Sequence, residues 1–123
     1  MRIFLGVCNL IIPIIMILIG VITMRDIPEK VNNYVGYRTA RSMKNIDTWR
    51  FANRYSGRVL RKLGVIGFIV SIIVTILGLL LSLEVLGILS IFLVVFQLCL
   101  IFSSIYFVER KLKEKFDDNG DYR

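Results

Sequence analysis

The residues whose types and spacing could do chemistry gather between two long apolar stretches. Arg38 lies two residues after Gly36 and directly before Thr39. In such a turn a guanidinium can make several directed hydrogen bonds to carbonyls, a carboxylate or a lipid phosphate. It could equally tie the turn to its own helix ends or to Asp47. Arg38 is the candidate binding residue of this segment, and the other residues singled out with it are Asn32, Gly36, Tyr37, Thr39, Ser42, Asn45, Trp49 and Asn53.

Three of these residues have a structural role open to them as well. Tyr37 and Trp49 carry amphipathic rings of the kind that anchor a chain at a membrane surface. The Asn53 side chain could hydrogen-bond back to the turn at Gly36–Thr39. That contact would make the segment one folded unit.

Downstream of the turn, the sequence predicts an amphipathic helix with a basic face. Asn45 is a suitable N-cap and Asp47 makes the first turn acidic, so the helix should begin there and run into the next apolar stretch. A stripe of arginines on this helix predicts contact with anionic lipid headgroups or with a protein or peptide partner. Direct binding of nucleic acid is not expected, because such a stripe gives only non-specific attraction. The stripe consists of Arg50, Arg54, Arg58 and Arg61.

The sequence offers few residues that could catalyse a reaction. The chain has no histidine, and Cys8 and Cys99 both fall inside apolar stretches. General acid–base catalysis would depend on Asp26, Glu29 or Asp47 alone. We therefore expect no enzyme, no catalytic residue, no metal site and no cofactor. An enzyme acting on lipid headgroups is the weaker alternative.

Three uncharged runs are the elements that must position these residues. Of the 123 residues, 56% are hydrophobic and the mean hydropathy is +0.72, which argues against a water-soluble domain. The runs are 22, 21 and 24 residues long, and about 20 apolar residues in a helix cross a bilayer. We predict an all-α integral membrane protein in one domain (1–123), with transmembrane helices at 3–24, 63–83 and 86–108, a loop with the amphipathic helix at 25–62 and a tail at 109–123.

The basic residues beside the runs predict the orientation. The segment 25–62 holds ten Lys and Arg and the tail five, whereas Arg2 alone lies on the other side. The positive-inside rule then places the N-terminus outside and the loop and C-terminal tail in the cytoplasm. We expect a multi-pass membrane protein. The mixed charges of the tail predict a solvated, partly disordered end.

Polar and small residues within the runs predict close helix packing. Asn9, Thr75 and Gln97 are the intramembrane polar residues of interest, and Thr75 is the expected partner of the Gln97 amide. Small residues let helix backbones approach closely in lipid. A line of them in the second run could form a seam within one chain or between copies in a homo-oligomer: Gly64, Gly67, Ser71, Thr75, Gly78 and Ser82.

The loop residues also carry a resemblance. They are Gly36-Tyr37-Arg38-Thr39, then Ser42, Asn45, Trp49, Ala52-Asn53 and Gly57, ahead of a two-helix hairpin. This arrangement resembles the SdpI family of bacterial membrane proteins, in which a G-x-R-T stretch, a downstream Trp and a following Asn or His lie in a loop between helices. The resemblance covers roughly residues 28 to 108. Longer members read Pro and Thr-His where Ala40 and Ala52-Asn53 stand, so this chain is similar to the short branch.

The resemblance implies a function without catalysis. The family is named for the immunity protein against the SDP killing-factor peptide, and its best-understood member also sequesters an ArsR-like cytoplasmic repressor at the membrane. For this chain it implies a place in the bacterial inner membrane and immunity to a membrane-active toxin peptide, signalling through such a repressor, or both. It also implies that the motif residues bind the partner: Asn32, Gly36, Tyr37, Arg38, Thr39, Ser42, Asn45, Trp49 and Asn53. A small accessory or structural subunit of another membrane protein complex is the alternative.

Overall fold

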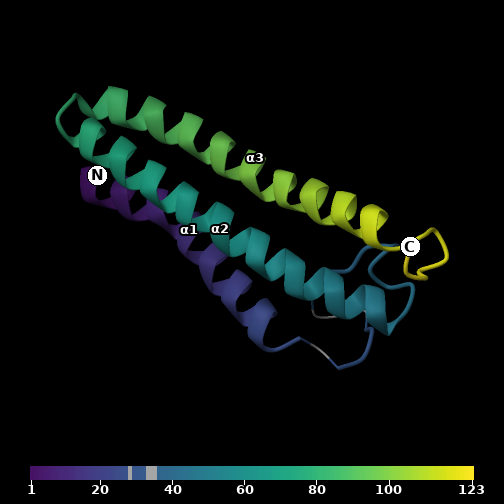
Figure 1. The fold of residues 1–123 in the computed structure, drawn as a ribbon. Coiled ribbons are helices and arrows are strands. Elements are labelled where there is room, and N and C mark those ends of the chain that lie inside the picture. Colours follow the sequence, from purple (N-terminus) through teal and green to yellow (C-terminus); the bar gives the residue numbers. More distant parts are fainter. Residues whose placement is uncertain (28, 33–35) are drawn as a thin grey trace.

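Three long helices make up most of residues 1–27, 29–32 and 36–123, which the computed structural model describes. α1 covers Arg2–Arg25, α2 covers Ile46–Leu79 and α3 covers Leu83–Lys115 (Figure 1). Each is long and apolar enough to cross a membrane, and no strand is present among the described residues. The predicted all-α architecture with three transmembrane helices is confirmed.

α2 begins at the residue that the sequence predicts. The Asn45 side chain accepts a hydrogen bond from the backbone N–H of Thr48, and the Thr48 hydroxyl accepts one from the backbone N–H of Asn45. This capping box satisfies donors that a helix start leaves unpaired. The helix then continues for 34 residues, or about 50 Å at 1.5 Å per residue. Since the hydrocarbon core of a bilayer is about 30 Å thick, its first turns must extend beyond it.

The turn between α2 and α3 comes slightly earlier than predicted. α2 ends at Leu79 rather than at residue 83, because the Ser82 side chain accepts from the N–H of Val85 and starts α3. The Arg2 guanidinium donates to the carbonyls of Leu79 and Leu81, 3.1 and 2.8 Å away. It therefore caps the free carbonyls at this end of the hairpin.

Glycines set the spacing between α1 and α2. A Cβ on Gly57 would lie 2.7 Å from the carbonyl oxygen of Gly20, and one on Gly64 would lie 2.8 Å from Ile17 Cγ1. The buried part of the small-residue line is Gly64, Gly67, Ser71 and Gly78. These residues form a seam within the chain, where small side chains allow close approach.

Buried amides connect all three helices. Asn9 Nδ2 of α1 donates to Thr75 Oγ1 at 3.2 Å and to Ser90 Oγ at 3.1 Å. Gln97 Nε2 donates to Ser71 Oγ at 2.8 Å and to the carbonyl of Asn9 at 2.9 Å. The prediction that Thr75 pairs with Gln97 is wrong: Thr75 pairs with Asn9, and Ser71, one helical turn earlier, lies at the depth of Gln97.

The C-terminal tail folds back on the start of α2. Phe116 is fully buried against Ala52 and Leu112, and the Asn45 amide donates to the carbonyl of Gly120 at 2.7 Å. An isolated β-bridge joins Phe116 and Tyr122. The prediction of a solvated, partly disordered end is wrong for Phe116 and Gly120, which are buried because the apolar Phe116 ring has a core to enter. The tail residues Asp118, Asn119, Asp121, Tyr122 and Arg123 are exposed, as predicted.

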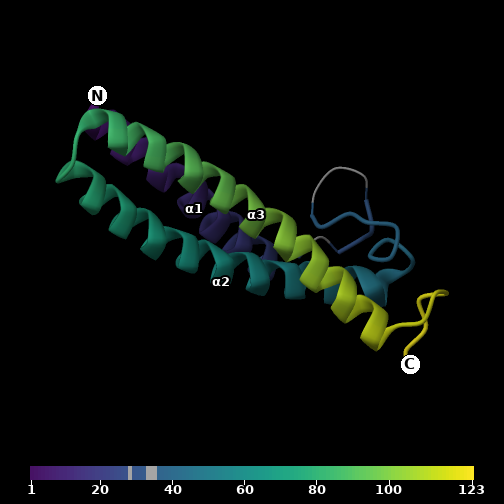
Figure 2. The same ribbon diagram turned by 90° about the horizontal axis from the view of Figure 1, so that it is seen from above.

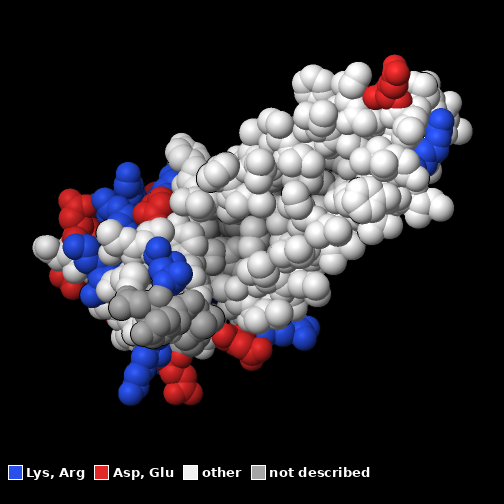
Figure 3. Space-filling model, turned by 180° about the vertical axis from the view of Figure 1, so that it is seen from behind, with Lys and Arg blue, Asp and Glu red and all other residues white. Residues whose placement is uncertain are grey.

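α1 and α3 diverge toward the loop. Asn9 links the two helices near their other end, and from there α1 and α3 separate on opposite sides of α2 (Figure 1). The loop after α1 and the C-terminal tail lie at the same end of the molecule (Figure 2), which we call the loop end. Figure 3 shows the charged side chains at the two ends, with an uncharged shaft between them.

Candidate recognition site at the loop end

The turn at Gly36 is built around glycine. Its φ is +106°, in the left-handed region that residues with a Cβ rarely adopt. A Cβ there would also lie 2.5 Å from Asn53 Oδ1 and 3.3 Å from the Trp49 ring. Gly36 therefore lets the loop backbone approach the first turns of α2.

Asn53 fastens this turn to α2. Its Oδ1 accepts a hydrogen bond from the backbone N–H of Tyr37 at 2.8 Å, and its Nδ2 donates to the carbonyl of Trp49 at 2.9 Å. The Asn53 side chain is fully buried, so loss of either bond would leave a buried polar group unpaired. The predicted contact between Asn53 and the turn is confirmed.

Ser42 closes the next part of the loop. Its hydroxyl accepts from the N–H of Thr39 at 2.8 Å, and its own N–H donates to Thr39 Oγ1 at 3.2 Å. The Thr48 hydroxyl of α2 donates to the carbonyl of Ser42 at 3.0 Å. These bonds join residues 36–53 into one folded unit, which we call the loop unit.

Tyr37 joins the loop unit to α3. Its hydroxyl donates to Glu109 Oε1 at 2.7 Å. Burial, and then the hydrogen bond to Glu109, raise the pKa of the Tyr37 phenol above its ordinary value. The phenol is therefore a neutral hydrogen-bond donor at physiological pH. Glu109 was not among the residues predicted from sequence, because no local pattern connects positions 72 residues apart.

The other predicted residues occupy different surroundings. Trp49 is fully buried beneath Gly36, so its interpretation as an aromatic anchor at the membrane surface is wrong. Arg38 is exposed on the loop unit, and the Asn32 side chain donates to the carbonyl of Lys30. Asn32 precedes residues 33–35, which lie outside the described part of the chain.

An apolar groove runs along the bilayer-facing side of the bundle below the loop unit, where α1 and α3 separate. A cavity of about 350 Å³ lies at the loop unit, between Ile22 of α1 and Ile105 of α3. A second cavity, of about 310 Å³, continues deeper, and both are lined by Ile19 and Leu60. The upper cavity includes Gly36, Tyr37, Ser56 and Ser104, and the lower one Ile12, Ile15, Met16, Leu98 and Ile101. The groove thus presents polar groups at its mouth and apolar side chains along its length.

The predicted basic stripe lies on another side of α2. Arg50, Arg54 and Arg58 are exposed and line a cleft of about 440 Å³ beside α3 and the tail, whereas Arg61 is half-buried with its backbone near Gly20. Within residues 1–27, 29–32 and 36–123, no group of three or more His, Cys, Asp and Glu side chains is placed to hold a metal ion.

Comparison with known proteins identifies a family for this chain. The SdpI/YfhL protein family matches residues 29–107, which include the loop unit and the hairpin. A relative from Bacillus subtilis (strain 168), described as uncharacterized protein YfhL, is 39% identical over 46 residues. The matched stretch is 37% of this chain and 42% of that relative, less than half of its length. No solved structure matches. Because the family match covers more than half of the chain, this multi-pass membrane protein belongs to the SdpI/YfhL family.

Proposed function

We propose that this protein recognises a membrane-active peptide and protects the cell that carries it. The observation behind the proposal is the loop unit, which lies at the mouth of the groove between α1 and α3. A membrane-active peptide has an apolar face that such a groove can bury, and polar groups that Tyr37 and Ser104 can meet.

The hydrogen bonds of the loop unit support this proposal. Asn53 holds the turn on α2 and Glu109 holds Tyr37 on α3, so the groove mouth is fixed before any ligand arrives. A preformed site loses less conformational entropy on binding than one that must first be ordered. Arg38, exposed on the same unit, supplies a cation for a carboxylate or carbonyl of the peptide.

The orientation that the basic residues predict sets where binding occurs. With the loop end in the cytoplasm, the groove opens into the inner half of the bilayer. A depolarising peptide must enter the membrane to act. The protein would therefore capture the peptide after that entry. Capture there would keep it from assembling into a conducting form.

A membrane depolarisation assay tests the proposal. Sensitive bacteria challenged with an SDP-like peptide are compared when they carry the protein, an empty vector or a variant. We expect protection by the unchanged protein and its loss in Ile19→Trp, which fills the groove, and in Arg38→Ala. Matched controls are Leu18→Trp, on an exposed face of α1 outside the groove, and Lys44→Ala, an exposed cation of the same loop.

The results of this assay test the binding site and the immunity function separately. If the protein protects and Ile19→Trp protects as well as Leu18→Trp, the groove is not the site. If the inserted protein gives no protection, immunity to that peptide is wrong.

A protein partner on the basic face of α2 is the alternative function. The exposed Arg50, Arg54 and Arg58 side chains favour it, and the partner would be a cytoplasmic repressor or a larger membrane protein. Stoichiometric co-purification of one partner, lost when these arginines are changed to Gln, would support this alternative over immunity.

A further inference from the structure

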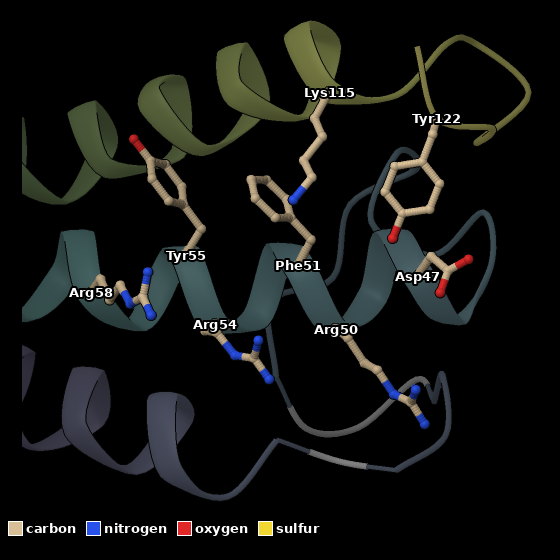
Figure 4. A pocket seen from close by; sticks show the side chains of 8 residues that line it. All are labelled: Asp47, Arg50, Phe51, Arg54, Tyr55, Arg58, Lys115 and Tyr122. Carbon is tan, nitrogen blue, oxygen red and sulfur yellow. The ribbon is translucent and has the colours of Figure 1, made fainter.

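A second cavity system lies on the other side of α2 from the groove between α1 and α3. The cleft of about 440 Å³ is formed by the first turns of α2, the last turn of α3 and the tail (Figure 4). Phe51 and Tyr55 point toward α3, whereas Arg50 and Arg54 extend to the opposite side of α2. Its lining residues are Asp47, Arg50, Phe51, Arg54, Tyr55, Arg58, Lys115 and Tyr122.

The charge of this cleft is strongly positive. Four cations line it against one carboxylate, that of Asp47. Within the described part of the chain, Arg50, Arg54 and Arg58 make no ion pair. They recur every four residues, so they lie one above the other on the helix and repel one another. An anion between them would remove that repulsion and accept several directed hydrogen bonds.

Aromatic rings give the cleft a rigid wall. Phe51 and Tyr55 are stacked 5.7 Å apart, and Lys115 Nζ lies 4.4 Å from the Phe51 ring centroid. Phe116 packs edge-on against Phe51 and in turn contacts Tyr122 of the tail. This wall of the cleft is therefore built from three segments: α2, the end of α3 and the tail.

The cleft continues toward the membrane as an apolar groove. A cavity of about 380 Å³ shares Tyr55 and Arg58 with it and is lined further down by Val59, Leu63 and Ile66 of α2 and Phe107 of α3. Lys62 also lines this cavity and is the last charged residue before the uncharged part of α2. A cationic pocket at the membrane surface that passes directly into an apolar groove has the two parts of a phospholipid site.

We propose that this cleft binds an anionic phospholipid, with its phosphate between Arg54 and Arg58 and an acyl chain along Val59, Leu63 and Ile66. The apolar continuation favours a lipid over a soluble protein, which would not extend between membrane-spanning helices. It also favours a lipid over free phosphate, which would leave the groove unfilled. The inference does not depend on peptide recognition, because the two cavity systems are lined by different residues.

Lipid binding to the purified full chain tests the proposal. Fluorescent phosphatidylglycerol is titrated into the delipidated protein in a neutral detergent, with phosphatidylcholine of the same chains and glycerol phosphate as the other arms. We expect phosphatidylglycerol to bind most tightly. The double variant Arg54→Gln/Arg58→Gln should weaken it by roughly 10- to 30-fold, the effect of two surface cations. The control Lys30→Gln/Lys113→Gln removes the same charge from exposed positions outside the cleft and should change it less than about twofold.

A second pair of variants tests the acyl-chain groove. Ile66→Trp fills it, whereas Ile69→Trp adds the same bulk to an exposed face of α2 outside it. Weaker phosphatidylglycerol binding in Ile66→Trp alone is expected.

Three results would overturn the proposal. The first is equal loss of binding in the two charge-matched double variants, which indicates non-specific attraction. The second is binding of glycerol phosphate as tight as that of the lipid, which indicates a soluble-anion site. The third is unchanged lipid binding in Arg54→Gln/Arg58→Gln together with loss of a co-purifying protein, which indicates a protein-docking surface.

Discussion

At the scale of single residues, Tyr37 is the link between the loop unit and α3. Its phenol donates to Glu109 and is half-buried, and both conditions favour the neutral form. Folding therefore raises the pKa of this phenol above the ordinary value of 10.0. The stability that this shift contributes is fully present below that ordinary pKa and is lost as the pH rises above it, because the unfolded state then releases a proton that the folded state retains.

We predict that Tyr37 ionises after the exposed tyrosines. In an alkaline titration followed by tyrosinate absorbance, the unchanged protein and Tyr37→Phe should give the same amplitude near pH ~11, where ordinary tyrosines are ionised. They should differ only when the protein unfolds. A lower tyrosinate amplitude in Tyr37→Phe at that pH, with both proteins folded, would contradict the buried hydrogen bond.

At the residue scale, the sequence predicts a contact correctly where the two partners are close in the chain or where the side chain has a turn nearby to hydrogen-bond. Asn45 caps α2 because its side chain reaches a donor three residues later, and Asn53 bonds the turn as expected. The Tyr37–Glu109 bond could not be predicted, since it depends on how α3 crosses the loop end. The prediction for Trp49 is wrong because its burial also depends on tertiary structure, namely on the loop that covers it.

At the scale of elements, the contact between α1 and α2 depends on paired glycines. Gly57 leaves no space for a side chain, because a Cβ there would meet the backbone of Gly20 and Met24 within 2.8 Å. We predict that Gly57→Leu lowers the free energy of unfolding in detergent by at least about 2 kcal/mol, since the helices must separate. Gly87→Leu is the control, because nothing lies within 4 Å of a Cβ at that position. Equal thermal stability of the two variants would show that the contact of Gly57 with α1 is not under steric constraint.

The attachment of α1 to the hairpin depends on Asn9. Its amide bonds both Thr75 of α2 and Ser90 of α3. We predict that Asn9→Leu destabilises the bundle by about 1–2 kcal/mol, as expected for interhelical hydrogen bonds in a membrane. Ser103→Ala, which removes a hydroxyl bonded only to its own helix at Cys99, should change stability by less than about 0.5 kcal/mol. Thermal unfolding in one detergent compares them, and similar losses would argue against the network.

Helix number and type are the part of the fold that the sequence predicts best. Three uncharged runs of transmembrane length leave little choice of element, and a turn as short as the one after α2 requires an antiparallel hairpin. The divergence of α1 and α3 could not be predicted, because it depends on which helix each small residue faces. The apolar groove between α1 and α3, with residues such as Ile19 and Leu60, follows from that divergence and could not be predicted for this reason.

At the scale of the whole molecule, the loop unit and the tail must share one side of the membrane. Asn45 bonds Gly120, and Phe116 enters the core beside Ala52. Of the sixteen Lys and Arg residues, fifteen lie in the segment 25–62 or in the tail. The positive-inside rule assigns this end to the cytoplasm. Together these observations predict both the side and the co-location of the two segments.

Cysteine labelling checks this orientation. In a chain with Cys8 and Cys99 replaced by Ser, a membrane-impermeant maleimide should label Glu84→Cys in intact cells. Lys44→Cys and Asn119→Cys should react only after the cells are permeabilised. Labelling of Lys44→Cys in intact cells would contradict the orientation, and different behaviour of Lys44→Cys and Asn119→Cys would contradict the fold.

Photo-crosslinking of a labelled SDP-like peptide in membranes tests peptide recognition in the groove most directly. A photoreactive amino acid replaces Leu60 on the groove floor or Ile69 on an exposed face of α2. We predict a peptide crosslink from position 60 that excess unlabelled peptide suppresses, and only weak, unsuppressed crosslinking from position 69. Equal crosslinking from both positions, or none from position 60 in the inserted protein, would contradict recognition in the groove.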